Sequence, residues 1–434
     1  MPVDPERALS GVRADVARIL GKSLEGRDLG IPEMVRLLEC QGREFLALLE
    51  TADSLRRRSV GHRVTYVVNR NINFTNVCAK KCSFCAFSRT YRSDEGYLLP
   101  VSEIVRRARE ARQFGATEVC IQAGLPPAMP GDLYIRICQA VTDALPGLHV
   151  HAFSPEEISY GCQRSGMPVR DYLAELRDAG IGSLPGTSAE ILDDDLRDLI
   201  SPGRISSGEW TRIISTAHSL GIRTSSTMMF GHLETPVHIA RHLAHLRAIQ
   251  RQTGGFTEFV PLGFVHTEAP LYQSGRLPNL RAGPTGWEVL KVHAVARMAL
   301  DKDIPNLQVS WVKEGMKLAQ LCLAAGGNDL GGTLINESIS TAAGAGHGQL
   351  VTPEELHRVI RDAGRVPAER NTLYGTLRTF TGDDEDAAHP LDSLRDGDRN
   401  RFGSYAQLTR SPKFRFNPGA APGGGRRGTL TTES

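Results

Sequence analysis

Three cysteines stand close together at Cys78, Cys82 and Cys85, in the spacing CxxxCxxC. Thiolates this near in sequence can bind a common metal centre. Structural zinc sites usually take four ligands from two paired clusters, and the neighbouring sequence offers no second CxxC or HxxxH. A cluster of four irons bound by three cysteines would instead leave one iron open to a substrate. The spacing therefore favours an iron–sulfur cluster over zinc and over three unrelated core cysteines.

The other cysteines lie in apolar helix or strand contexts, and we expect them to be small core residues. They are Cys40, Cys120, Cys138, Cys162 and Cys322. Eight cysteines in 434 residues are too few for a disulfide scaffold. An iron–sulfur cluster also needs a reducing compartment, and the N-terminus lacks a leader-like pattern, so we expect a cytoplasmic protein.

Polar side chains also occur on several predicted strands. His149 and His151 would share one face of a strand, and we expect His151, with Ser154 just after it, to contact a substrate. Polar and charged groups on interior strands are costly to bury alone, so they either bind a ligand or pair with each other. Four further residues fall under this argument and are candidates for substrate contact: Glu258, His266, Asn328 and Asp329.

Short apolar or β-branched runs alternate with helical stretches through most of the chain. This alternation predicts a (β/α)8 TIM barrel, in which active sites form at the carboxyl ends of the strands. A doubly wound open sheet needs the same alternation and stays an alternative. The predicted strands are 72–75, 117–122, 149–153, 183–187, 223–229, 258–264, 307–311 and 328–330.

The flanking segments differ in character from the barrel, which we expect over residues 62–380. Residues 1–61 have helical spacing and predict an N-terminal helical cap. Residues 381–398 hold seven acids and one base, and residues 399–427 hold seven bases and no acid. With few apolar groups to bury, the segment 381–434 is expected to be mostly disordered, with a docking arm for a partner as the alternative.

The overall composition excludes two classes of protein. Lys and Arg number 51 against 49 Asp and Glu, so the net charge of +2 lacks the basic footprint of a nucleic-acid binder. No apolar run approaches the ~20 residues needed to cross a bilayer. We therefore expect neither nucleic acid nor a membrane among the partners.

The cysteine motif on a barrel pattern resembles the radical S-adenosylmethionine (SAM) superfamily, whose hallmark is CxxxCxxC with an aromatic residue, here Phe84, before the last cysteine. The resemblance implies that the three cysteines bind a 4Fe–4S cluster, that its open iron binds SAM, and that a 5'-deoxyadenosyl radical abstracts hydrogen from a substrate. It also implies SAM-binding positions after the second, fourth and fifth strands. These are Gln122, Ala123, Thr187, Glu190, Thr227, Met229, Gly231 and Glu234.

The sequence qualifies two of these SAM-binding assignments. Ala123 stands where the superfamily usually has a glycine, which makes a close approach slightly less free. Thr187 and Glu190 could cap the helix that follows instead of binding ribose hydroxyls.

The resemblance is more specific over residues 62–375. This part of the chain resembles the tyrosine 4-hydroxyphenyl transferases of deazaflavin biosynthesis, the CofH family. The resemblance implies that L-tyrosine is cleaved between Cα and Cβ and that its 4-hydroxybenzyl group is transferred to 5-amino-6-(D-ribitylamino)uracil. It further implies a partner radical SAM deazaflavin synthase and an electron donor such as flavodoxin or ferredoxin. The stretches that carry it are VTYVVNRNINFTNVC, HVHAFSPEE, LPGTSAEILDD, TSSTMMFGHLETP, GGFTEFVPLGFVH, QVSWVK and GGNDLGGTLINESIS.

Two other interpretations stay open. A futalosine-pathway menaquinone enzyme or a natural-product homologue would use the same radical on a different acceptor, and Gly263 and the C-terminal tail depart from the transferase pattern. A metal- or cluster-binding protein without catalysis is an alternative of another class.

Overall fold

The computed structural model describes residues 11–80, 82–382, 389–394 and 401–417. Most of the strands form a six-stranded sheet in the order β2-β3-β4-β5-β6-β7, in which every neighbouring pair is parallel. Its members are β2 (Asn69–Ile72), β3 (Glu118–Ile121), β4 (His149–Ala152), β5 (Ser183–Leu184), β6 (Arg223–Phe230) and β7 (Phe256–Gly263). A second sheet has the order β10-β9-β1-β8, with β1 (Arg63–Val67), β8 (Asp329–Gly332), β9 (Val366–Arg370) and β10 (Thr376–Thr379).

Isolated parallel bridges join the two sheets into a ring. Phe259 of β7 pairs with Leu307, and Gln308 pairs with Asp329 of β8. Beyond β8, Ile335 pairs with Arg70 of β2. The six strands β2 to β7, the segment 307–308 and β8 therefore occupy the eight positions of a closed parallel ring. This confirms the predicted (β/α)8 barrel and excludes the open sheet.

The seventh predicted strand is shorter than expected. Pairing stops at Gln308, and helix α14 (Trp311–Glu314) occupies the end of the predicted run. The cause is local, because the carbonyl of Ser310 accepts from the N–H groups of Lys313 and Glu314 and so begins a helical turn. This turn brings the side chain of Lys313 to the carboxyl end of the barrel.

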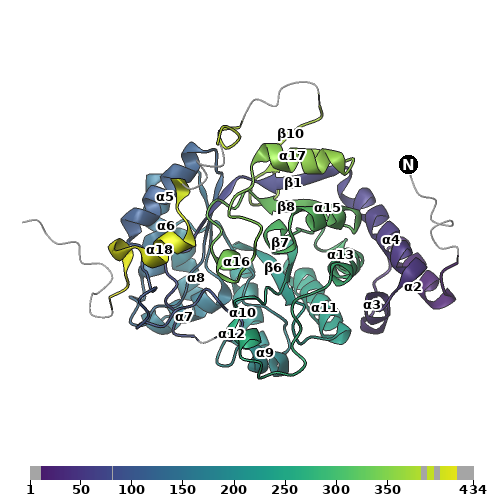
Figure 1. Ribbon diagram of the computed structural model, residues 1–434, viewed down its shortest axis with the longest axis horizontal. Helices are drawn as coiled ribbons and strands as arrows, with labels where there is room; N and C mark the ends of the chain where they lie inside the picture. The colour runs from purple at the N-terminus through teal and green to yellow at the C-terminus, as the bar shows by residue number, and fades with distance from the viewer. Residues whose placement is uncertain (1–10, 81, 383–388, 395–400, 418–434) are drawn as a thin grey trace, which may run out of the picture.

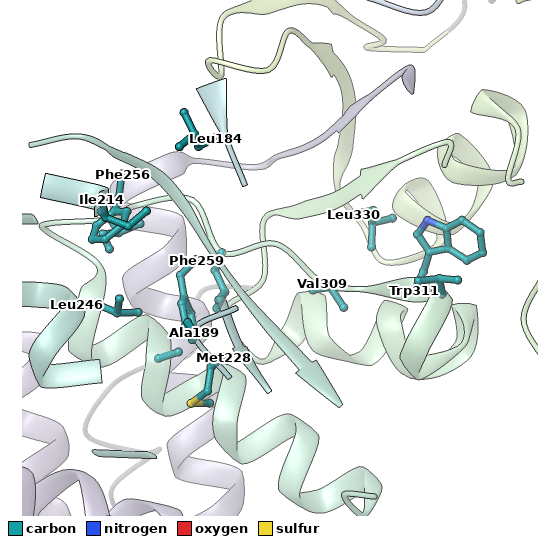
Figure 2. Close-up of a cluster of buried hydrophobic side chains, with 14 of the residues drawn as sticks. Leu184, Ala189, Ile214, Met228, Leu246, Phe256, Phe259, Val309, Trp311 and Leu330 are labelled. Carbon is teal, nitrogen blue, oxygen red and sulfur yellow. The ribbon is translucent and has the colours of Figure 1, made fainter. Parts of the chain in front are cut away.

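Helices surround the strands (Figure 1). Figure 2 shows the apolar core between the two layers, where Met228 of β6 and Phe259 of β7 lie near Leu246 of α11. Ser225 and Thr227 alternate with Met228 on β6 and border a cavity inside the ring. The helices are α5 (Val101–Gln113), α6 (Leu133–Ala144), α7 (Pro155–Ser165), α8 (Val169–Asp178), α9 (Asp194–Ile200), α10 (Ser207–Ser219), α11 (Pro236–Thr253), α12 (Pro270–Gln273), α13 (Gly286–Leu300), α15 (Met316–Ala324), α16 (Ile339–Ala342) and α17 (Pro353–Asp362).

Three further helices precede the barrel, α2 (Ala14–Leu24), α3 (Ile31–Leu38) and α4 (Gly42–Val60). They lie along one side of it, with α3 against α11 and α4 against α13 (Figure 1). Arg251 of α11 forms an ion pair with Asp28 in the connection between α2 and α3. No helix of the described ranges combines the length and hydropathy that a membrane span requires.

Residues 401–417 differ from the expectation of disorder. They contain α18 (Tyr405–Arg410) and a short 3-10 turn (Pro412–Phe414), and the side chains of Phe402 and Tyr405 are buried. The phenol of Tyr405 donates to the carbonyl of Phe87 (3.3 Å), inside the cysteine loop. The prediction from composition was wrong for residues 401–417. A few apolar side chains of this segment pack on the folded barrel, and these contacts offset the conformational entropy that the segment loses.

Candidate active site

The three cysteines lie on the loop that follows β2, at the carboxyl ends of the barrel strands. Cys78, Cys82 and Cys85 all border one cavity of about 350 Å³, which we call the mouth cavity. Neighbouring segments hold this loop through its backbone: the N–H of Ala79 donates to Leu125 O (2.7 Å) and the N–H of Cys78 to Arg89 O (3.0 Å). The same three cysteines also border an outer cavity of about 800 Å³.

The donor set fits an iron–sulfur cluster. Three thiols of one loop border a single cavity, and Phe84 and Phe87 add apolar cover to its wall. Among the described residues, no three His, Cys, Asp or Glu side chains converge to hold one metal ion. A four-iron cluster takes each cysteine on a separate iron, so its ligands need not converge in that way.

The turn after β3 borders the mouth cavity beside the cysteines. Gln122 Oε1 accepts from Thr187 Oγ1 (3.1 Å), and the N–H of Ala123 donates to Glu157 Oε1 (3.0 Å). Gly124 lies against the cysteine loop, where an added Cβ would stand 2.4 Å from the carbonyl oxygen of Val77. Position 124 therefore requires glycine, whereas Ala123 is accommodated without a positive φ.

Replacing Gly124 with alanine should disturb the cysteine loop, because Val77 directly precedes Cys78. We expect the free energy of unfolding to fall by about 1–3 kcal/mol and the iron bound per chain after anaerobic reconstitution to fall with it. Urea unfolding and iron analysis measure the two effects. Gly21→Ala is the control, since its Cβ would meet nothing within 4 Å in helix α2. An unchanged iron content in Gly124→Ala would contradict this account of the loop.

Glu190, predicted to bind SAM, forms an ion pair with Arg204. Arg204 Nη1 lies 2.7 Å from Glu190 Oε1, and its Nε lies 3.1 Å from Glu156 Oε2. All three side chains border the mouth cavity. Arg204 could not be predicted as a site residue, because a single arginine in the loop between α9 and α10 belongs to no motif.

The SAM-binding positions predicted after the fifth strand divide into two groups. Thr227 borders a cavity inside the ring, and its Oγ1 donates to the carbonyl of Gly186 (2.9 Å). Met229 belongs to a buried apolar cluster. Glu234 accepts from the N–H of Gly231 (2.6 Å) and pairs with Arg281, so its carboxylate holds the turn after β6. Met229, Gly231 and Glu234 border neither the mouth cavity nor the cavity inside the ring.

A third cavity, of about 170 Å³, lies inside the ring, and we call it the lumen cavity. It shares with the mouth cavity a boundary formed by Asn71, Gln122, Thr187, Leu262, Gln308 and Leu334. Asn71 Oδ1 is buried and has no hydrogen-bond partner among the described residues. A buried acceptor without a donor is costly, so this boundary is suited to a ligand with an N–H or O–H group.

His151 and Glu258, both predicted to contact substrate, border the lumen cavity. His151 Nδ1 lies 2.7 Å from Ser183 Oγ. Burial lowers the pKa of His151 to about 4, so its imidazole is neutral near pH 7. Burial also raises the pKa of Glu258 to about 7, although Arg370 opposes the shift.

The other predicted substrate contacts have different positions. Ser154 borders the mouth cavity, but it caps α7, where its hydroxyl donates to Glu157 (2.7 Å). Asn328 accepts from Arg297 Nη2 (2.7 Å), and Asp329 pairs with Arg370, so these two follow the alternative of pairing. The ring of His266 contacts Tyr272, with centroids 4.6 Å apart. Asn328, Asp329 and His266 border neither the mouth cavity nor the lumen cavity.

The raised pKa of Glu258 predicts a pH dependence of stability. Between pH 4.5, the ordinary value, and about 7, the folded state binds this proton more tightly than the unfolded state. The free energy of unfolding should therefore fall as pH rises through that window, by ~2–3 kcal/mol for this group. Glu258→Gln should remove that part of the decline and be the more stable protein at pH 8. Urea unfolding at pH 5 and pH 8 tests it, with the exposed Glu39→Gln as control.

Comparison with known proteins places this geometry in a class. Residues 72–246 match the Radical SAM superfamily, and residues 253–381 match the CofH/MqnC C-terminal region. The crystal structure of methylornithine synthase (PylB) has the same fold, with a TM-score of 0.61 and 19% identity over 81% of this chain and 97% of that one. Fold and site together define a radical SAM protein.

Two relatives narrow the assignment. A 5-amino-6-(D-ribitylamino)uracil–L-tyrosine 4-hydroxyphenyl transferase of Methanothermobacter thermautotrophicus is 46% identical over 364 residues, which cover 84% of this chain and 98% of the relative. An FO synthase of Streptomyces coelicolor is 46% identical over 86% of this chain, which spans only 42% of that longer protein. The chain belongs to the family of 5-amino-6-(D-ribitylamino)uracil–L-tyrosine 4-hydroxyphenyl transferases.

Proposed function

We propose that this chain cleaves L-tyrosine between Cα and Cβ and transfers the 4-hydroxybenzyl group to 5-amino-6-(D-ribitylamino)uracil, a step in deazaflavin biosynthesis. The observation that carries the proposal is the 46% identity with a transferase of that name across 98% of its length. The activity uses a 4Fe–4S cluster and SAM, which when bound supply a 5'-deoxyadenosyl radical that abstracts hydrogen.

The mouth cavity is the place for these cofactors. Cys78, Cys82 and Cys85 would hold the cluster, and Gln122 and Thr187 border the same space. The roles of Gln122, Ala123, Thr187 and Glu190 in binding SAM remain part of the proposal. Because the cysteine loop is held by neighbouring backbone, the cofactors would be fixed relative to the strands. Such positioning lowers the barrier by removing the entropy cost of bringing reactants together.

The lumen cavity suits the uracil and its ribityl chain. Its wall is rich in hydrogen-bonding groups, among them His151, Glu258 and Asn71. The uracil ring offers N–H donors, and the ribityl chain offers hydroxyls that both donate and accept. Asn71 Oδ1 lacks a partner and stands at the boundary with the mouth cavity. A substrate bound here would face the cofactors across that boundary.

Two partners follow from this chemistry. The cluster requires an electron donor such as flavodoxin or ferredoxin, and the outer cavity beside the cysteines carries Lys80, Arg89 and Arg92, which suit an acidic carrier. A second radical SAM enzyme, the deazaflavin synthase, would use the product. Because a reduced cluster needs a reducing compartment, we place the activity in the cytoplasm.

Anaerobic turnover tests the proposal. Reconstituted enzyme is incubated with SAM, a reductant, L-tyrosine and the ribitylaminouracil, and products are identified by mass spectrometry. We expect the benzylated dihydrouracil, 2-iminoacetate, methionine and 5'-deoxyadenosine. Formation of 5'-deoxyadenosine without 2-iminoacetate or coupled product would overturn the assignment and indicate a different acceptor. Zinc in place of iron and sulfide in the purified protein would overturn the radical chemistry itself.

A further inference from the structure

Lys313 lies on α14 and borders the mouth cavity together with Ser310 and Ser340. Its ammonium donates one hydrogen bond, to Ser340 Oγ (2.9 Å). Within the described residues, no carboxylate oxygen lies within the 4 Å of Nζ that an ion pair needs. An ammonium carries three donors, so at least two of those on Lys313 lack a partner among the described residues.

The nearby acids are engaged elsewhere. Glu337 accepts from the N–H groups of Ile339 and Ser340, at 2.9–3.1 Å, and so holds the first turn of α16. Glu314 accepts from the N–H of Gly263 (3.2 Å). By contrast, two other cations that border this cavity are paired: Arg204 contacts two carboxylates, and Lys80 lies 3.3 Å from Glu156 Oε1. Lys313 is therefore a cation at a cavity wall whose charge the fold has not paired.

Burial makes this arrangement costly without a ligand. Removal from water lowers the pKa of Lys313, and the Coulomb attraction of Glu337 offsets only part of that effect. The hydroxyl of Ser340 accepts from Lys313, and its own proton has no acceptor among the described residues. An anion placed between these two groups would receive a charge-assisted hydrogen bond from Nζ and a second one from Oγ.

We propose that Lys313 binds the α-carboxylate of the tyrosine substrate, with the Ser340 hydroxyl as a second donor. This rests on the proposed function. The uracil substrate has no anionic group, so the available carboxylates belong to tyrosine and SAM. Lys313 follows Gln308 and Ser310 along the chain, and Gln308 stands at the boundary of the two cavities. This position favours the carboxylate of tyrosine over that of SAM, because tyrosine must lie next to the ribitylaminouracil in the lumen cavity.

Truncated ligands isolate the carboxylate contact. Equilibrium binding is measured for L-tyrosine, for 3-(4-hydroxyphenyl)propanoate, which lacks the amine, and for tyramine, which lacks the carboxylate. We expect Lys313→Met to weaken binding of the two carboxylates ~10–100-fold, the range for a hydrogen bond to a charged group, without weakening tyramine. Lys313→Arg keeps the charge and should retain part of the preference. Lys317→Met, an exposed lysine on α15, is the matched control.

Each of the following results would overturn either the role of Lys313 or the proposed function. An equal loss for tyramine and tyrosine in Lys313→Met would show a packing role and overturn the proposal. A loss of SAM affinity with tyrosine binding intact would assign the contact to the carboxylate of SAM instead. If Lys313→Met does not fold, Ser340→Ala must weaken the two carboxylate ligands selectively, or the proposal fails. The proposed function fails separately, if the wild-type enzyme forms no coupled product.

Discussion

Cys82→Ser is expected to lose the iron–sulfur cluster, and the rate of product formation should fall by more than ~100-fold. Losing a residue that only supports a metal ligand costs up to ~100-fold, and losing a ligand itself should cost more. Cys82 borders both the mouth and the outer cavity, between the other two cysteines of the loop. A serine hydroxyl is a much poorer iron ligand than a thiolate at neutral pH. Iron and sulfide per chain, the visible absorption of the cluster and coupled product measure the effect.

The barrel itself should remain folded in this variant. The backbone turn at the loop is made by the N–H of Cys85 donating to the carbonyl of Cys82 (3.1 Å), which serine preserves. Cys162→Ala is the matched control, because Cys162 lies on α7 and borders neither cavity. It should keep both cluster and activity. Full iron content in Cys82→Ser, or loss of iron in Cys162→Ala, would refute the assignment of the ligands.

Arg370→Met is expected to lower the free energy of unfolding by ~3–5 kcal/mol, the cost of leaving a buried charge without its partner. Arg370 Nε and Nη2 lie 2.5 Å and 3.1 Å from the two carboxylate oxygens of Asp329, which is fully buried. The guanidinium also stacks on Tyr374, 4.0 Å from the ring centroid. Its removal would raise the pKa of Glu258 further, because Arg370 favours the charged form of that carboxylate. Urea unfolding gives the loss directly.

A double variant separates the charge from the packing. Asp329→Asn keeps an acceptor for the N–H of Gly331 but removes the buried charge. Combined with Arg370→Met, it should be less destabilising than Arg370→Met alone or than the sum of the two single changes. Arg63→Met, an exposed change on the neighbouring strand β1, should stay within ~0.5 kcal/mol. Simple additivity in the double variant would mean that the ion pair is not the source of the loss.

The sequence predicted the parts of the site that carry a local pattern. The cysteine spacing is such a pattern, and so is the alternation that places His151 and Glu258 on the inner face of the barrel. Arg204, in the loop between α9 and α10, and Lys313, on the short helix α14, were not predicted as site residues, because their neighbours in sequence do not indicate which cavity each side chain reaches. Arg370 comes from β9, after the barrel, and meets Asp329 across a long stretch of chain.

Other residues were predicted at the site and belong to the framework. Glu234 lies in the turn after strand β6, as a ligand-binding residue could, but its partners are the N–H groups of its own turn and Arg281. Asn328 is engaged by Arg297 from the outer helix α13. Both have the residue type of a ligand contact. Only three-dimensional pairing, which one sequence does not reveal, distinguishes the two roles.

The contacts of residues 401–417 set the order in which the molecule can be completed. Leu98, just after the cysteine loop, donates its N–H to Phe414 O (2.8 Å), and the N–H of Phe416 donates to Gly96 O (2.8 Å). The chain is made from the N-terminus, so these bonds can form only once residues 414–416 have left the ribosome. The loop that begins at Cys78 therefore acquires its last backbone supports only after residues 401–417 have been synthesised, long after the cysteines themselves.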